Sequence, residues 1–187
     1  MLLQTQFRMY GKTGQRGAIM RESDLIIISP NTGYEEPEPM QRNDILDQYQ
    51  RAFIVTNQKV FNNELPPIKI DYMGELADDI RTKYFNDILA CFLYHPEKKE
   101  PPLIFLQFET PPEMGISTDE IDDLLHELIH YYCYLHNIKD CNADYHNLQF
   151  KETAEKHGAV CEYLGSDVGY MYTHWPNKLL DEILKEI

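Results

Sequence analysis

The chain has 187 residues, 43% of them hydrophobic, which is enough for one domain with a core of its own. No apolar run approaches the ~20 residues that a membrane span needs, and the first residues do not resemble a signal peptide. The formal net charge of −14 repels phosphate, so non-specific binding to nucleic acid is not expected. We expect a cytoplasmic protein that does not associate with membranes.

The first 42 residues differ in composition from the rest, because they combine several glycines with a Pro/Glu stretch. Residues 20–29 contain the run Leu25-Ile26-Ile27-Ile28 and read as a strand, and residues 4–10 could pair with it across a glycine-rich turn. We therefore predict that residues 1–42 form a hairpin extension followed by a linker.

Residues 43–165 carry the pattern of a compact domain. An amphipathic helix is expected from Asn43 or Asp44 to about Asn62. Three strands are expected to follow, at residues 68–73, 86–94 and 103–108. After them come a helix at 117–135, a short polar connector at 137–144 and a second helix at 145–157. Gly158 ends the second helix.

Residues 166–187 are predicted to form a short strand or loop and a final helix, Lys178–Ile187, which Asn177 caps and which packs on the domain. The resulting order of elements, α-β-β-β-α-α, predicts an α+β fold. In this fold a small mixed sheet of about three to four strands packs on helices.

The four cysteines, Cys91, Cys133, Cys141 and Cys161, are spread along the chain without a C-x-x-C pair. This spacing argues against both a zinc ribbon and a disulfide framework. We predict reduced and mostly buried thiols, with Cys133 serving in packing rather than as a metal ligand.

One pentapeptide points to a particular chemistry: His126-Glu127-Leu128-Ile129-His130, a single H-E-x-x-H. Histidines four residues apart on a helix point the same way, about one turn apart, which suits two ligands of one zinc ion. The Glu beside the first His can act as general base on a water molecule at the ion.

The surrounding residues strengthen this interpretation. Ser117 followed by Glu120 forms a capping box, and the apolar residues after it recur every three or four positions. The helix is therefore amphipathic and largely buried, with His126 and His130 within or beside its apolar band. Buried histidines need partners, because burial strips the imidazole of water.

A catalytic zinc usually has three protein ligands and an open fourth position. His136 has the spacing of a metzincin third ligand, but Cys133 stands where the helix-breaking glycine of that pattern belongs. His146 is the better candidate, because the connector lets a second helix fold back beside the first. Four other downstream residues are weaker candidates for the third ligand: His157, Glu152, Glu155 and His174.

Together these residues resemble the SprT-like (Spartan-type) zinc metalloprotease domain. Its pattern is H-E-x-x-H followed, after some fifteen residues, by a third His in H-G-x-x-F; here His146 and Phe150 match that His and Phe, and Asn147 replaces the Gly. The segment Phe61-Asn62-Asn63-Glu64-Leu65-Pro66-Pro67 also resembles the family's link between its first helix and first strand. The resemblance covers about residues 44–165 and implies a zincin-like fold with an H-E-x-x-H active-site helix.

The chain also departs from this family. It has neither the cysteine-rich zinc ribbon of many relatives nor basic DNA-binding segments. It looks more like the standalone SprT-like proteins of phages and mobile elements. Direct nucleic-acid binding is therefore not expected, although the resemblance leaves room for it, and the sequence does not indicate the oligomeric state.

The resemblance implies a zinc metalloendopeptidase acting on a protein or peptide substrate, with His126, His130 and His146 holding Zn²⁺ and Glu127 as general base. The alternative is a SprT-like zinc-binding protein that acts by contact alone, and a third reading is a latent enzyme with residues 1–42 over its cleft. An oxyanion-stabilising residue is also expected, from Tyr145, Tyr170, Tyr172 and His174. The edge of the third strand, residues 103–108, could bind substrate as an added strand.

Overall fold

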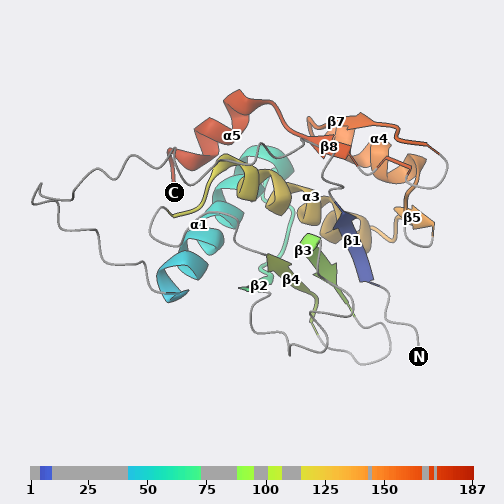
Figure 1. Ribbon diagram of the computed structural model, residues 1–187. Coiled ribbons are helices and arrows are strands. Elements are labelled where there is room, and N and C mark those ends of the chain that lie inside the picture. Colours follow the sequence, from blue (N-terminus) through green and yellow to red (C-terminus); the bar gives the residue numbers. More distant parts are fainter. Residues whose placement is uncertain are drawn as a thin grey trace, which may run out of the picture.

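The computed structural model describes residues 5–9, 42–72, 88–94, 101–106, 115–142, 145–165, 169–170 and 172–187. Within these residues the protein is α+β, as predicted, with a small mixed sheet covered by helices (Figure 1). None of the described helices has the length and apolar character to cross a membrane.

The main sheet has four strands in the order β1-β3-β4-β2: β1 (Thr5–Met9), β3 (Ile88–Leu93), β4 (Leu103–Leu106) and β2 (Lys69–Tyr72). β2 and β4 are parallel, whereas β3 is antiparallel to both β4 and β1. The sheet is therefore mixed, as expected. β1 pairs with β3, while the segment predicted to pair with it, residues 20–29, lies outside the described residues.

The predicted substrate edge on the third strand is wrong. β4 lies between β3 and β2 and pairs with both along Leu103–Leu106, so its backbone groups are already used on both sides. The sequence pattern identified the strand but not its neighbours, since strand order is set by tertiary packing.

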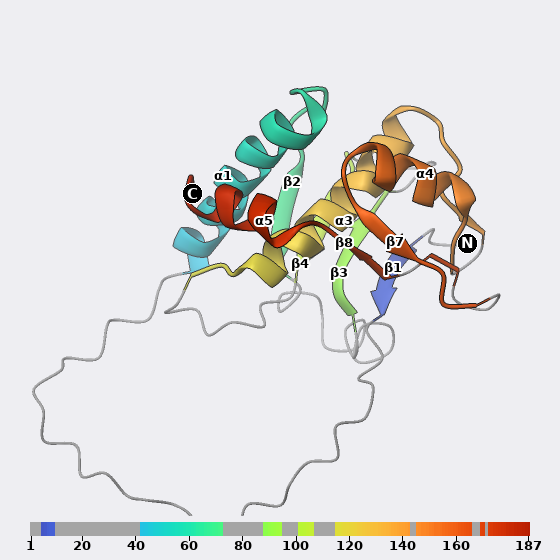
Figure 2. The same ribbon diagram turned by 90° about the horizontal axis from the view of Figure 1, so that it is seen from above.

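Two long helices, α1 (Arg42–Phe61) and α3 (Thr118–Leu135), pack on the sheet, α1 against β2 and α3 mainly against β3 (Figure 2). α3 begins with the predicted capping box: the Ser117 backbone N–H donates to the Glu120 carboxylate at 2.6 Å, and the Glu120 N–H donates to the Ser117 hydroxyl. Its apolar side chains join those of α1 and the sheet in one core.

The C-terminal third of the described chain packs beside α3. It contains β5 (Cys141–Asn142), β6 (Tyr145–His146), α4 (Leu148–Lys156), β7 (Val160–Glu162), β8 (Tyr172–His174) and α5 (Asn177–Leu184). β5 pairs with β6 and β7 with β8, while α5 packs on α1 and α3.

Two predicted helix starts in this region are wrong. The helix predicted from Tyr145 begins at Leu148, because Asn147 caps it and Tyr145 is extended in β6. The final helix has Pro176, not Asn177, at its N-cap, and Asn177 is its first residue. The predicted end at Gly158 is confirmed: Gly158 follows the C-cap with a φ of +88°.

Candidate metal centre

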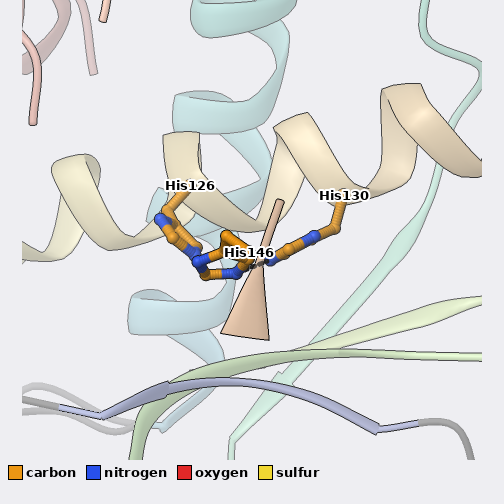
Figure 3. A group of neighbouring side chains, drawn as sticks. All are labelled: His126, His130 and His146. Atoms are coloured by element: carbon orange, nitrogen blue, oxygen red, sulfur yellow. Dashed lines mark hydrogen bonds between the residues drawn. The ribbon is translucent and has the colours of Figure 1, made fainter. Parts of the chain in front are cut away.

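Three histidine side chains meet between α3 and β6. His126 and His130 project from the same side of α3 toward His146 on β6 (Figure 3). One ring nitrogen from each lies within 4.8 Å of the others, and Nε2 of His130 is 3.0 Å from Nε2 of His146. The exposed fractions of the three residues are 0%, 1% and 2%. The structure therefore brings together the three residues predicted to be ligands.

The helical repeat of α3 alone accounts for the positions of His126 and His130. A spacing of four residues places both imidazoles on one side of α3, about one turn apart, and their ring centroids are 5.0 Å apart. Both lie well inside the helix, away from ends that fray. α3 is buried from Glu120 to Cys133, so both rings are shielded from solvent.

Contacts with several segments of the chain hold His146 in position. On one side β6 pairs with β5, with His146 opposite Cys141. The Asn147 side-chain amide donates to the Lys139 carbonyl at 2.7 Å, and the Asn147 backbone N–H donates to the Asp140 carbonyl at 2.9 Å. These bonds fasten the residue after the third histidine to the connector that follows α3.

On the other side, Gly169 forms an isolated parallel bridge with His146, and the Tyr170 N–H donates to the His146 carbonyl at 3.1 Å. Gly169 has a φ of +66°, and a Cβ at this position would overlap the His146 carbonyl oxygen. Only glycine combines that backbone angle with so close an approach. Gly169 is therefore a positioning residue for His146 that the sequence reading missed, because no local pattern links the two.

Phe150 forms the apolar floor of the cluster. Its ring stacks on His146 at a centroid distance of 4.0 Å and lies 4.9 Å from His130 and 5.1 Å from His126. It is fully buried in the first turn of α4, at the position that matches the Phe of the family pattern. Such a shell excludes water and strengthens electrostatic interactions at the site.

Asp140 orients His130. Its Oδ2 lies 2.7 Å from His130 Nδ1, and the residue is buried. With the Nδ1 proton donated to Asp140, His130 presents the lone pair of Nε2 toward His146, which is the carboxylate–histidine arrangement typical of zinc ligands. The sequence predicts such an acceptor but does not identify it, since Asp140 lies in a connector without periodicity.

Two groups of side chains in the described part of the structure could hold a metal ion: the three histidines, and His130 with Asp140 and Cys141. Two nitrogen ligands on tetrahedral zinc, each ~2.0–2.1 Å from the ion, are ~3.3 Å apart, close to the 3.0 Å between His130 and His146. The 2.7 Å between His130 and Asp140 is instead the length of a charge-assisted hydrogen bond.

Glu127 lies between the two helical histidines in sequence and is completely buried. The pKa of the Cys91 thiol is raised well above its usual value, first by burial and then by the nearby charge of Glu127. Both residues are buried, Glu127 on α3 and Cys91 on β3, and these two elements pack together.

The weaker candidates for the third ligand lie away from the three-histidine group. His136 caps the end of α3 and stacks on Tyr132, while His157 packs between Tyr132 and Phe61, where burial lowers its pKa. Glu152 and Glu155 are exposed on α4. These four, and His174 on β8, are not among the residues that meet at the three-histidine group.

The structure describes some of the tyrosines predicted to stabilise an oxyanion, and it describes the cysteines predicted to be mostly buried. Tyr145 precedes His146 on β6, and Tyr170 follows Gly169, so both flank the third histidine. The side chain of Tyr172 lies outside the described part of the structure. Cys91 and Cys133 are buried, and burial raises the pKa of the Cys133 thiol to about 12, which suits packing rather than ligation.

Comparison of the chain with protein-family models, with curated proteins and with solved structures finds no match in any of the three.

Proposed function

We propose that the chain is a zinc metalloendopeptidase with a SprT-like, zincin-like active site. The observation that carries the proposal is the meeting of His126, His130 and His146 in a buried group of nitrogen donors, with Glu127 next to His126 in the sequence. A site that served stability alone would need the ligands but no buried carboxylate beside them. Asp140 and Phe150 add the orienting acceptor and the apolar shell that such centres use.

Each residue then has a distinct task. A zinc ion held by the three histidines would supply the Lewis acidity that activates water and polarises the peptide carbonyl. Glu127 accepts a proton from the attacking water at its carboxylate and passes it to the departing amide nitrogen. Asp140 accepts the Nδ1 proton of His130 in a hydrogen bond, so that the lone pair of Nε2 remains available to bind the metal ion. The substrate is a protein or peptide chain.

The decisive variants are Glu127→Gln and His146→Ala. Zinc content is measured by elemental analysis, and cleavage is measured with fluorescein-labelled casein. Glu127→Gln is expected to keep stoichiometric zinc and to lower kcat/KM by about 10²- to 10⁴-fold, the range of general acid–base catalysis. His146→Ala is expected to lose both zinc and cleavage. Glu155→Gln, which changes an exposed glutamate on α4, is the matched control.

Two outcomes would contradict the proposal. Full cleavage by Glu127→Gln would show that Glu127 is not the general base. Zinc-loaded wild type that cleaves no casein would favour the second function considered from the sequence, a zinc-binding protein that acts by contact.

A further inference from the structure

We propose that Cys141, Asp140 and His130 form a second metal site, which takes a thiophilic divalent cation and competes with the three-histidine group for His130. This goes beyond the proposed function and rests on it in one respect, that the three histidines hold zinc. An ion at the second site releases that zinc and so inhibits the peptidase. The second site consists of a shared histidine, a buried carboxylate and a partly exposed thiol.

The donor atoms of this second group lie close together. One ring nitrogen of His130, one carboxylate oxygen of Asp140 and Sγ of Cys141 are all within 4.8 Å of one another. Nitrogen, oxygen and sulfur ligands of one tetrahedral ion lie ~2.0–2.3 Å from it and are therefore ~3.3–3.6 Å apart. Small side-chain rotations would bring the three donors onto one ion, with a water molecule in the fourth position.

His130 presents its two ring nitrogens to different groups. Nε2 lies 3.0 Å from Nε2 of His146, within the three-histidine group (Figure 3), whereas Nδ1 lies 2.7 Å from Oδ2 of Asp140. A neutral imidazole has one lone pair for a metal ion, because its other nitrogen carries the proton. Zinc at Nε2 requires the proton on Nδ1, where Asp140 accepts it. An ion at Nδ1 requires the proton on Nε2, which then cannot bind zinc.

The β5–β6 hairpin places Cys141 beside both groups. Cys141 is opposite His146 in the antiparallel pair. The Asn147 backbone N–H donates to the Asp140 carbonyl at 2.9 Å, which joins the residue after β6 to the residue before β5. One short hairpin therefore connects the two groups, and a change at the Asp140 carboxylate acts directly on His130 through their hydrogen bond.

Exposure and donor chemistry favour a thiophilic cation taken from solution. The three histidines have exposed fractions of at most 2%, and Asp140 is also buried, whereas Cys141 is partly exposed. The Cys141 thiol is therefore the most accessible donor of the two groups. A set of thiolate, imidazole and carboxylate ligands selects zinc, cadmium and similar ions over magnesium or calcium, which prefer oxygen ligands alone.

The exchange of ions balances in protons. The incoming cation forms bonds to Cys141 Sγ, an Asp140 oxygen and His130 Nδ1. The Cys141 S–H bond breaks and its proton passes to water, because a thiol binds a metal as the thiolate. His130 keeps one proton, which leaves Nδ1 and is replaced from water at Nε2. Zinc loses its bond to Nε2 and departs, since only two histidines remain to hold it.

The test uses the full-length chain, loaded with one equivalent of zinc and titrated with CdCl₂. The ultraviolet charge-transfer absorption of a thiolate–Cd²⁺ bond reports ligation by sulfur. Elemental analysis after gel filtration reports the zinc and cadmium that stay bound. Cys141→Ser removes the thiol of the second site. Cys161→Ser is the matched control, because it removes the other partly buried cysteine, on β7.

Wild type and Cys161→Ser are expected to gain the absorption band and to lose zinc as cadmium binds. Cys141→Ser should lose most of the band and need at least about tenfold more cadmium for the same loss of zinc, because removing a ligand costs no less than removing a group that orients one. Equal loss of zinc from Cys141→Ser and wild type would overturn the proposal. Cadmium bound at Cys141 with all zinc retained would overturn the competition for His130.

A second measurement needs no variant and covers a Cys141→Ser chain that fails to fold. Zinc-loaded wild type is treated with iodoacetamide, with and without CdCl₂, and alkylation of each cysteine is followed by peptide mass spectrometry. At a cadmium concentration that fills about nine of ten sites, alkylation of Cys141 should slow about tenfold, because only the free thiolate reacts. Alkylation of Cys161 should not change. Equal alkylation of Cys141 with and without cadmium would overturn the second site.

Failure of the proposed function gives a different result. A chain that binds no zinc, or that binds zinc and cleaves no casein, would reject the peptidase. In such a chain, protection of Cys141 by cadmium would retain the second metal site, because this readout does not depend on cleavage. Absence of that protection would reject the second site as well.

Discussion

The two halves of the candidate metal centre are held in different ways. His126 and His130 come from one regular helix, and the helical repeat places their rings side by side. His146 lies on a two-residue strand, held between the connector at Lys139–Asp140 and the close approach of Gly169 and Tyr170. The first half needs only local geometry, whereas the second depends on contacts that must form together.

This contrast predicts which half of the site is stable without metal. A packed helix with a capping box stays ordered through its own hydrogen bonds and burial. A short strand held by a few backbone bonds opens more readily, and the ion would close it by bridging β6 to α3. We expect metal binding to stabilise the β6 side far more than α3.

The largest expected effect comes from metal removal. At free zinc about 1,000-fold above Kd, binding contributes about 4 kcal/mol to the free energy of unfolding, and chelation removes this contribution. Hydrogen exchange should then accelerate at the amides of Asn147 and Tyr170, whose acceptors lie in the clamp around His146. The amides in the middle of α3 should change much less. Equal acceleration in both halves would show that α3 also depends on the ion.

A smaller effect is expected from Gly169→Ala. The substitution forces a residue with a side chain into a φ of +66°, at a cost of about 1–2 kcal/mol, and pushes the new Cβ against the His146 carbonyl. We expect zinc affinity to fall by about 10- to 100-fold, the range seen when a group that orients a ligand is lost. Zinc affinity is measured by competition with a chromophoric chelator.

Gly158→Ala is the matched control for this substitution. Gly158 also has a positive φ, +88°, but its Cβ would meet no atom within 4 Å. Its alanine variant should lose a similar amount of stability, measured by urea denaturation, and keep the zinc affinity of wild type. If both variants bind zinc equally well, the approach of Gly169 to His146 has no role in ligation.

The same contrast explains what the sequence could predict. The H-E-x-x-H pair, the capping box and the burial of α3 follow from residue spacing, and the structure places them as expected. The connector predicts that a second helix folds back beside the first, and α4 does pack on α3, but His146 lies in the extended strand just before that helix, which Asn147 caps. Gly169 and Asp140 were missed because their roles arise from contacts between segments that no local periodicity connects.

Asn147 stands where the SprT-like pattern has a glycine, and this difference has a physical explanation. Asn147 has a φ of −94°, which any residue adopts, so this position does not need glycine. Its side-chain oxygen accepts from the N–H groups of Gln149 and Phe150, while its amide reaches Lys139. The substitution thus adds a helix cap and a link across the connector.

The smallest effect, and the sharpest comparison, comes from removing one cap in each half of the site. Ser117→Ala and Asn147→Ala each delete an N-cap side chain, and each should lower the free energy of unfolding by about 1 kcal/mol in urea titrations. The two substitutions should differ in their effect on zinc affinity. Ser117 lies nine residues before His126 on a well-packed helix, so its loss should leave zinc affinity unchanged. Asn147 adjoins His146 and bonds to the Lys139 carbonyl, so its loss should weaken zinc binding several-fold. Equal zinc affinities in the two variants would mean that β6 is held as rigidly as α3, and that the third ligand owes nothing to the connector beside it.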